Sequence, residues 1–426
     1  MNVLMLGWEL PPLFSGGLGV ATYGLVKSLR NKVKIKLIVP RSSPSSSLED
    51  VDIIGLNRVV VSQLSGEENI RSLDKILEDV QRIPVSISPY HEVNKILQHQ
   101  TVGKETIFQS TAAKEIQQFF STGEVYGTEI LRKVHLFAEL VDQLAGSNFD
   151  VIHAHDWVTY SAGLKVKGRT GKPLVLHVHS LETDRAGETV KNEIYQLEKI
   201  ALEQADKIIA VSRYTRDQII RHYQIDADKI EVVHNGIETK VIVRKEHKLT
   251  DKIVVFLGRI TNQKGPHFLL ETANKVVKVY PNVKFFVAGT GDQFAHLLET
   301  TAYQKLGRKF IFAGFLPKDK VDELLAMADV YFMPSVSEPF GLTALEAAQH
   351  FVPGVLSKQS GASEVLTATL HADFWDTDKH ANYIFALLKY NALHRELAKK
   401  SNDQATALTW DSAAAKVFSL YQRLLE

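Results

Sequence analysis

Hydrophobic residues gather in short runs of strand length, and longer stretches with the periodicity of amphipathic helices separate these runs. Strands that alternate with helices in this way are typical of a parallel sheet with helices on both faces. Two consecutive doubly wound sheets explain the two series of runs better than one very large sheet. The pattern therefore predicts an α/β protein with two Rossmann-like domains. The expected strands lie at residues 3–6, 33–39, 151–153, 174–179, 207–211 and 231–233, and then at 253–257, 283–288, 309–312, 330–333 and 352–356.

A charged stretch without clear periodicity, residues 237–250, lies between the two series of expected strands. We interpret it as a hinge between an N-terminal domain, residues 1–240, and a C-terminal domain, residues 251–409. Residues 41–130 mix weak strand and helix signals, and we interpret them as an elaboration of the first domain.

The last segment, residues 410–426, has one apolar helical stripe. It predicts a terminal helix with Asp411 or Ser412 as the N-cap. The sequence alone does not reveal the surface on which this helix docks.

Composition excludes several classes of function. Of the 426 residues, 45% are hydrophobic and 23% charged, an ordinary globular mixture that is sufficient for two cores. Fifty Lys and Arg against 49 Asp and Glu give a net charge of +1, so we expect no general attraction to nucleic acid or an anionic membrane. The absence of cysteine excludes disulfides, thiolate nucleophiles and cysteine-ligated metals. With no visible secretion signal and no run of about 18 apolar residues, we expect a cytoplasmic protein without a membrane span.

A glycine cluster that includes Gly16, Gly17 and Gly19 lies between the first expected strand and a helix. Glycines there allow close backbone approach, and the N–H groups of a helix start attract anions. A flexible turn is the alternative interpretation. The cluster does not match a dinucleotide fingerprint, because eight residues separate it from Gly7 at the strand end, and NAD is therefore disfavoured.

A second loop of the same kind, from Gly258 to Gly265, opens the second series and carries Arg259 and Lys264. It is not a Walker A loop, because Gln263 and Gly265 stand where glycine and a hydroxyl residue are required. Two cations at the carboxyl end of a strand suit a diphosphate. A solvated basic loop is the alternative.

The most specific string runs from Glu338 to Glu346 and leads from a strand into a helix. Pro339 and Gly341 force an irregular loop, and the orphan N–H groups of the helix start face that loop. Two carboxylates around such a helix start are expected to bind hydroxyl groups, for example those of a sugar and a ribose. A surface charge at Glu338 and a buried Glu346 that accepts from neighbouring amides are the alternatives.

Taken together, these strings resemble the retaining glycosyltransferases of the GT-B type, the group 1 or family 4 enzymes related to glycogen and starch synthases. The string from Glu338 to Glu346 matches the E-x7-E pattern of the group. The markers follow the order of the family along most of the chain: 16–19, 153–157, the strand end at His179, 211–212, 235–236, 258–265, 289–292 and 338–346.

The resemblance implies a role for each part of the site. Arg259 and Lys264 would contact the donor diphosphate, and Glu346 the ribose. Glu338 and the following amides would hold the donor sugar, with His179 beside the reacting carbon. It also implies that the terminal helix crosses back onto the first domain. The expected catalytic residues are His179, Arg259, Lys264 and Glu338, the expected substrate-binding residues are Gly16, Gly17, Gly258, Phe340, Gly341, Leu342, Thr343 and Glu346, and no metal ligand is expected.

These roles predict an enzyme that moves a hexose, expected to be glucose, from a UDP-, ADP- or GDP-linked sugar to a glycan or small-molecule acceptor with retention. No cofactor is expected beyond the nucleotide sugar as co-substrate. Phe14 stands where bacterial glycogen synthases carry lysine, which weakens a glucan synthase assignment. The segment 360–364 lacks the paired glycines common in the group, a mild departure.

Other functions remain open from the sequence. His153 with His155, and His177 with His179, are i, i+2 pairs that each face one way on a strand, as ligands of a metal hydrolase can. Asp156 would then point to the opposite face. A sugar-nucleotide epimerase on the same fold and a non-catalytic sugar-nucleotide binder are further alternatives.

The triplet Asp376-Thr377-Asp378 resembles the D-x-D metal motif of the other large glycosyltransferase fold. An apolar helical stripe follows Asp378, so we interpret the triplet as a helix N-cap.

Overall fold

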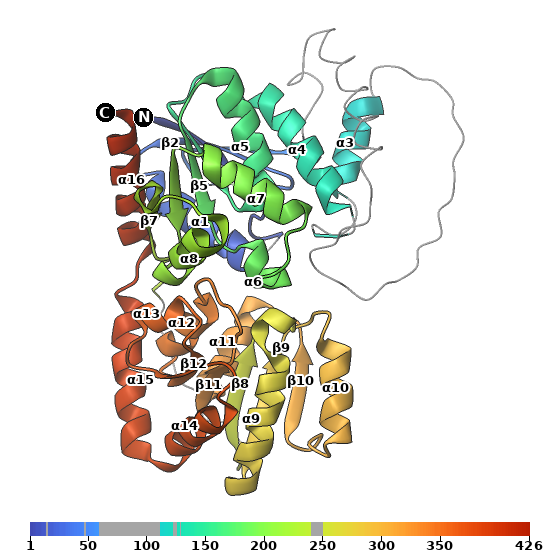
Figure 1. Cartoon of the computed structure of the whole chain (residues 1–426), viewed down its shortest axis with the longest axis vertical. Helices are drawn as coiled ribbons and strands as arrows, with labels where there is room; N and C mark the ends of the chain where they lie inside the picture. Colours follow the sequence, from blue (N-terminus) through green and yellow to red (C-terminus); the bar gives the residue numbers. More distant parts are fainter. Residues whose placement is uncertain (14–15, 47, 59–110, 122–125, 128, 240–249) are drawn as a thin grey trace, which may run out of the picture.

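The computed structural model describes residues 1–13, 16–46, 48–58, 111–121, 126–127, 129–239 and 250–426. Two α/β bodies lie one above the other along the long axis of the molecule, each built around a parallel sheet (Figure 1). We call the body with the first sheet the N-terminal domain and the body with the second sheet the C-terminal domain. The prediction of two doubly wound, Rossmann-like sheets is confirmed.

The first sheet has the strand order β3-β2-β1-β4-β5-β6-β7, and every pairing is parallel. Its strands are buried on both faces: Val3 and Met5 point into one core, and Leu4 and Leu6 into the other. The strands are β1 (Asn2–Leu6), β2 (Lys34–Val39), β3 (Val51–Gly55), β4 (Val151–His155), β5 (Leu174–Val178), β6 (Lys207–Ala210) and β7 (Ile230–Val232).

Helices cover both faces of this sheet. Apolar residues of α4, α5 and α7 form one core, and those of α1 and α16 form the other. The helices of this domain are α1 (Gly17–Leu29), α3 (Thr111–Ser121), α4 (Ile130–Ala145), α5 (Trp157–Thr170), α6 (Glu182–Ala186), α7 (Glu193–Gln204) and α8 (Arg213–Gln218), with short turns η1 (Pro44–Ser46), η2 (Leu56–Arg58), η4 (Ile219–Tyr223) and η5 (Ala227–Lys229).

The second sheet has the order β10-β9-β8-β11-β12-β13, again parallel throughout. Residues of α11, α12, α13 and α15 pack on one face, and residues of α9, α10 and α14 on the other. The strands are β8 (Lys252–Leu257), β9 (Val283–Ala288), β10 (Phe310–Gly314), β11 (Val330–Met333), β12 (Gly354–Ser357) and β13 (Leu370–Ala372). The helices are η6 (Asn262–Lys264), α9 (Pro266–Val279), α10 (Phe294–Tyr303), α11 (Lys318–Met327), α12 (Leu342–Gln349), α13 (Ala362–Val365), α14 (Thr377–Lys389) and α15 (Asn391–Thr406).

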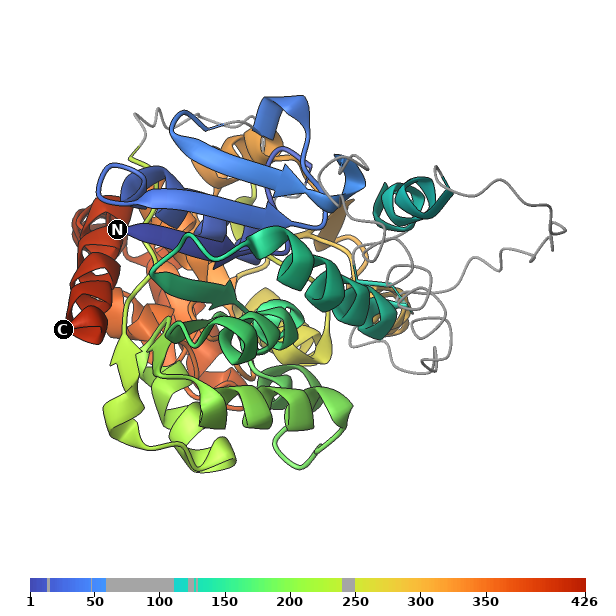
Figure 2. The same cartoon turned by 90° about the horizontal axis from the view of Figure 1, so that it is seen from above.

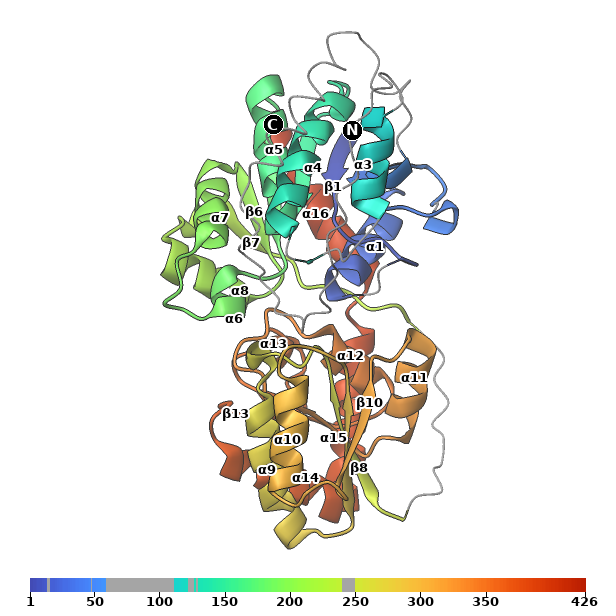
Figure 3. The same ribbon diagram turned by 90° about the vertical axis from the view of Figure 1, so that its right-hand side faces the viewer.

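The terminal helix α16 (Trp410–Leu425) crosses back from the C-terminal domain and packs beside α1 (Figures 2 and 3). Trp410 lies so close to Gly24 of α1 that a Cβ at Gly24 would lie 2.2 Å from the indole ring. The backbone of Ile237 pairs with that of Leu408, so the outgoing and returning segments lie side by side. The predicted crossing is confirmed.

The expected N-cap residues of two helices need correction. Thr409 caps α16 by accepting from the amide of Ser412, so the prediction of Asp411 or Ser412 is wrong. The triplet at the start of α14 does contain an N-cap, which is Asp376. Asp378 lies within the first turn and pairs with Lys275.

Other expectations are met only in part. Strands β3 and β13 were not among those expected, and β4 continues two residues further, to His155. Phe14, most of the expected hinge and residues 59–110 of the expected elaboration lie outside the described residues. Among the residues that the structure describes, no helix has both the length and the apolar character needed to span a bilayer.

Candidate active site

The candidate residues follow the carboxyl ends of the strands in both sheets, where open α/β sheets bind ligands. The glycine cluster follows β1, and the histidines lie on β4 and β5 or follow β5. In the second sheet, Arg259 and Lys264 follow β8, and the string from Glu338 to Glu346 follows β11. The loop after β11 contacts α6 and the N-cap of α8, and helix α13 after β12 contacts α8, so the carboxyl-end segments of the two sheets meet at the domain boundary.

The glycine loop rests on a buried carboxylate. Gly16 is the N-cap of α1, and Glu9 accepts a hydrogen bond of 3.0 Å from the amide of Gly19. A Cβ at Gly16 would lie 2.7 Å from the same carboxylate, whereas one at Gly17 meets no described atom within 4 Å. The hydroxyl of Tyr126 donates to the other oxygen of Glu9. One amide of the helix start is thus already satisfied, and the role of Gly16 and Gly17 toward phosphates stays a prediction.

Four histidines form a stack on one face of the first sheet. Their rings follow one another at centroid distances of 4.4 to 5.3 Å, with interplanar angles of 5° to 28°. At the boundary end, Nδ1 of His155 and Nε2 of His179 are 3.0 Å apart. At the other end, Nδ1 of His153 bonds to the hydroxyl of Tyr421 on α16. The four members of this histidine stack are His153, His155, His177 and His179.

Burial keeps the histidine stack uncharged. It is the largest cause that lowers the pKa of His153 to about 3, with His179 as the second cause, and it alone lowers the pKa of His179 to about 3. Burial also lowers the pKa of His155 and of His177 well below the ordinary value, with the neighbouring imidazoles as the next cause. The stack therefore presents neutral imidazoles to the domain boundary at neutral pH.

The alternative of a metal site rests on His153, His155 and His177, whose ligand atoms all lie within 4.8 Å of one another. Both ring nitrogens of His177 lack a hydrogen-bond partner among the described residues. However, a metal ion lies in the ring plane of each imidazole that binds it, and nearly parallel stacked rings share no such point. Shared coordination requires the rings to rotate, so the stack as it stands does not fit a metal site.

Asp156 has a strained backbone, with φ 63° and ψ 165°, directly after His155. This region is almost restricted to glycine, costs about 1–3 kcal/mol for other residues, and is enriched at active sites. Burial raises the pKa of Asp156 to about 6, although Arg185 opposes the shift. The sequence indicated only that Asp156 leaves the histidine face, because a turn of the backbone is not visible in residue types.

Arg259 and Lys264 lie on the loop that follows β8, and Arg259 is exposed. Gly265 has a φ of 67°, and a Cβ there would lie 2.2 Å from the carbonyl oxygen of Pro334. Only glycine fits this approach, which brings the loop against the end of β11. As a result the Lys264 ammonium forms an ion pair with Glu338, 74 residues away in the sequence.

Gly258, at the start of this loop, packs backbone to backbone against Gly289 of the neighbouring loop. A Cβ at Gly289 would lie 1.8 Å from the carbonyl oxygen of Gly258. Both loops are therefore fixed at the carboxyl ends of β8 and β9.

The string after β11 folds as an irregular loop into α12. Glu338 is 7% exposed, and Gly341, with a φ of 95°, is the N-cap of α12 without a side-chain hydrogen bond. Glu346 projects from α12 and pairs with Lys318 at 2.5 Å. Phe340 is buried, Leu342 begins the helix, and the Thr343 hydroxyl lies 2.7 Å from that of Tyr331.

Several hydrogen bonds join the two domains around this loop. The hydroxyls of Ser212 and Thr215 donate to the carbonyl of Pro339, at 2.6 and 3.2 Å. Glu364 accepts from the amides of Arg213 and Tyr214, at 3.0 and 2.6 Å, and thereby satisfies the N-terminus of α8. Although burial raises the pKa of Glu364, these bonds and one from His234 hold it below its ordinary value. No residue pattern around Glu364 predicts this role.

Comparisons with known proteins cover both domains. Residues 111–241 match the family model described as Glycosyltransferase Family 4, and residues 238–404 match that described as Glycosyl transferases group 1. An uncharacterized glycosyltransferase of Methanocaldococcus jannaschii is 25% identical over 100% of this chain and 99% of that protein. The α-maltose-1-phosphate synthase of Mycolicibacterium smegmatis is 30% identical over 64% of this chain and 79% of its own. Anabaena HepE, solved in complex with UDP-glucose, superposes with a TM-score of 0.64 at 16% identity, over 99% of this chain and 100% of that chain.

Proposed function

Since the chain belongs to the group 1 glycosyltransferases, enzymes of the GT-B fold, we propose that it moves a hexose from a nucleoside-diphosphate sugar to a carbohydrate or small-molecule acceptor with retention. The observation that carries the proposal is the Lys264–Glu338 ion pair beside the start of α12. The loops after β8 and β11 together provide a cation for the phosphate, a carboxylate for the sugar hydroxyls and the amides of a helix start.

The second domain supplies the binding groups for the donor. Lys264 exchanges its bond with Glu338 for one with the diphosphate, and Glu338 then accepts from hydroxyls of the sugar. Arg259 lies on the same loop, and Glu346 accepts from the ribose once it leaves Lys318. HepE is described in complex with UDP-glucose, which supports a nucleotide-linked glucose as the donor class.

Departure of the nucleoside diphosphate develops negative charge on the phosphate oxygen. Lys264, Arg259 and the amides at the start of α12 stabilise this charge. The bond from the anomeric carbon to the phosphate oxygen breaks, the bond to the acceptor oxygen forms on the same face, and the acceptor proton passes to the departing phosphate. This front-side course requires no enzymic nucleophile.

The first domain contributes His179 and the glycine loop. Because burial lowers the pKa of His179 to about 3, the ring is neutral at pH 7 and acts through hydrogen bonds, beside the sugar. The name of the Mycolicibacterium relative, an α-maltose-1-phosphate synthase, supports glucose units as acceptors.

A thermal-shift panel of UDP-, ADP- and GDP-glucose tests the donor class. A ligand at 100 times its dissociation constant should stabilise the protein by about 2.7 kcal/mol. With the donor found, NMR of products from maltooligosaccharide or glucose 1-phosphate should show retained anomeric configuration. An inverted linkage contradicts retention, whereas an epimerised sugar formed without acceptor indicates an epimerase.

A further inference from the structure

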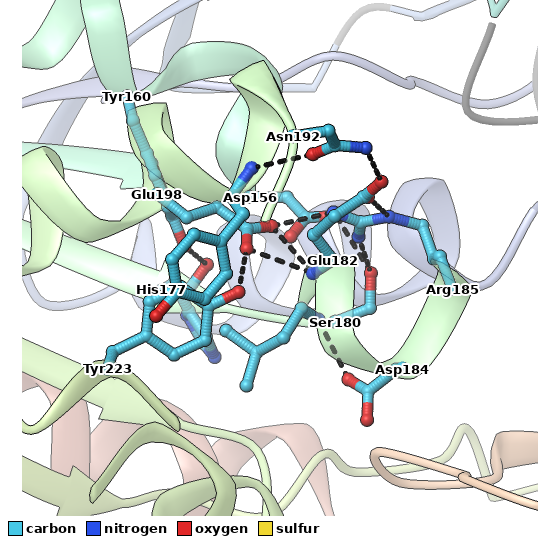
Figure 4. Close-up of polar contacts among 12 residues, drawn as sticks. Asp156, Tyr160, His177, Ser180, Glu182, Asp184, Arg185, Asn192, Glu198 and Tyr223 are labelled. Atoms are coloured by element: carbon cyan, nitrogen blue, oxygen red, sulfur yellow. Dashed lines mark hydrogen bonds and ion pairs between the residues drawn. The ribbon is translucent and has the colours of Figure 1, made fainter. Parts of the chain in front are cut away.

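The short helix α6 follows His179 by only two residues and connects two regions of the molecule. One side carries Glu182 and Arg185 and faces the interior of the first domain. Asp184 projects away from them and reaches the C-terminal domain (Figure 4). Because helix α6 also contacts the turn η6 that ends at Lys264, it lies over the expected diphosphate loop.

A buried ionic cluster holds helix α6 from the interior side. The Arg185 side chain is 2% exposed and pairs with Glu182 at 2.9 Å and with Glu198 of α7 at 2.6 Å. Both oxygens of Glu198 also accept from the amide of Glu182, at 3.0 and 2.9 Å. The Tyr223 hydroxyl donates to Glu198 as well, and Figure 4 shows these groups converging.

Burial of such a cluster contributes little net stability, because desolvation offsets the attraction between the charges. Burial raises the pKa of Glu198 to about 7, with Arg185 opposing the shift. What the cluster does supply is a fixed position, since every member has several directed partners. These contacts thus fix the position of helix α6 from the interior of the first domain.

On the other side of helix α6, Asp184 forms a hydrogen bond with the loop that precedes α12. Its Oδ1 accepts from the hydroxyl of Ser337, and its Oδ2 accepts from the amide of Leu181 at 2.8 Å. The Tyr214 hydroxyl lies 2.9 Å from the Ser337 oxygen and accepts from Gln218. Asp184 is 6% and Ser337 8% exposed, so this contact between the domains is shielded from water.

Ser337 immediately precedes Glu338, whose carboxylate pairs with Lys264. We propose that Asp184, through Ser337, is a positioning residue that sets Glu338 relative to His179 for sugar transfer. This proposal rests on the proposed function. The contact spans the domain boundary, and it keeps the sugar-binding carboxylate in register with the histidine of the opposite domain.

Three variants test the contact. Ser337→Ala removes the donating hydroxyl. Asp184→Asn replaces the carboxylate that accepts from Ser337 by a weaker acceptor and keeps one oxygen for the amide of Leu181. The double variant combines the two changes. Ser337→Thr keeps a hydroxyl and serves as the rescue. Ser401→Ala is the matched control, because Ser401 is a buried serine of the same domain whose hydroxyl donates to Ala398 within α15.

The rates of transfer and hydrolysis are measured with UDP- or ADP-glucose, whichever the panel selects, in the presence and absence of maltooligosaccharide. The affinity for UDP or ADP is measured by calorimetry. We expect Ser337→Ala and Asp184→Asn each to lower kcat for transfer about 10-fold, a change of about 1.4 kcal/mol in the barrier. Nucleotide affinity should change less than about 2-fold, and the hydrolysed fraction of donor should rise. The double variant should be no slower than the slower single variant. Ser337→Thr should restore most of the rate.

Unchanged kcat in Ser337→Ala, multiplying losses in the double variant or an equal loss in Ser401→Ala each overturn the positioning role. Thermal unfolding of every variant separates these results from loss of fold. If the wild-type enzyme neither transfers nor hydrolyses any nucleotide sugar, the proposed function is contradicted instead. An active wild type with an unaffected Ser337→Ala contradicts only the role of the contact.

Discussion

The two sides of the candidate site differ in charge and in burial. On the C-terminal side, Lys264 and Lys318 are partly exposed, and each holds a carboxylate that the proposed ligand would take over. On the N-terminal side, His153, His155 and His177 are buried and uncharged, and His179 extends the same stack to the boundary. In the proposed mechanism, the C-terminal side exchanges ionic partners and the N-terminal side keeps a fixed, neutral surface.

This difference indicates which domain binds the nucleotide and which groups the chemical step requires. Glu338 is buried, so the lysine can leave it at small cost only when another group satisfies the carboxylate. In the proposed complex the diphosphate becomes the partner of the lysine, and the sugar hydroxyls donate to Glu338. Buried neutral imidazoles have no charge to lose when the domains close, and their geometry depends on packing. We therefore expect binding of the nucleotide to depend on the C-terminal domain, and the chemical step to depend on both.

The largest loss should follow removal of the cation next to the leaving group. Lys264→Ala is expected to lower kcat by about 10²–10³-fold, because one preorganised stabilising group is lost. Nucleotide affinity should fall with it. Steady-state kinetics and calorimetry on the folded variant measure both quantities.

Lys275→Ala is the matched control for this change, since Lys275 also forms ion pairs in the C-terminal domain, but on α9 and with Glu271 and Asp378. Its kinetics should be close to those of the wild type. Near-normal turnover in Lys264→Ala would remove this lysine from the diphosphate site and weaken the contrast between the two sides.

A smaller but more selective loss is expected on the N-terminal side. His179→Ala should lower the transfer rate by about 10²-fold and leave nucleotide affinity within a few-fold of the wild type, because the expected nucleotide contacts lie in the other domain. His135→Ala, an exposed histidine on α4, is the control. Equal losses of rate and affinity in His179→Ala would make this residue part of the nucleotide site.

Local sequence signals predicted most of the fold. The expected strands at 283–288 and 330–333 agree residue by residue with β9 and β11, because both are apolar runs bounded by breakers. Strand β13 has only three residues, Leu370–Ala372, and forms because β12 offers an edge for pairing, which is a tertiary effect. At the start of α16, the residue types predicted Asp411 or Ser412 as the cap, whereas Thr409 caps the helix and Trp410, its first residue, packs on α1.

In the candidate site too, some residues could be predicted from the sequence and others could not. The resemblance to the GT-B enzymes implied that Lys264 and Glu338 serve one donor, and the two side chains form an ion pair. Asp184 and Ser337 had no such signal, because a single aspartate and a single serine are common surface residues. Their contact joins positions 153 residues apart and exists only once both domains are folded and docked.

Acid should destabilise the protein through the histidine stack. Because their pKa values are lowered, the four histidines bind fewer protons in the folded than in the unfolded state below about pH 6.5. The free energy of unfolding therefore keeps its full value above that pH and decreases as the pH falls. Asp156 and Glu198, with pKa values raised to about 6 and about 7, act in the opposite direction but are fewer. Urea unfolding at pH 7.5 and 5.5 should therefore show a net loss at pH 5.5.

The variant His177→Phe sharpens this test, since it keeps a stacked ring but binds no proton. It should reduce the acid loss by up to about 1.4 kcal/mol per pH unit, the linkage value for one proton. A wild-type stability that rises from pH 7.5 to 5.5 would mean that the buried carboxylates dominate.

The smallest effect is expected from metal removal. If Lys264, Arg259 and the helix-start amides stabilise the departing diphosphate, a divalent cation has no necessary part in that step. Exhaustive dialysis against a chelator should then leave transfer within about 2-fold of the untreated enzyme, and added Mg²⁺ should not raise it. Complete loss of transfer that Mn²⁺ or Zn²⁺ restores would instead require the rings of His153, His155 and His177 to turn toward a common ion. In that case the N-terminal side would carry charge after all, and its neutral, stacked state would describe only the metal-free protein.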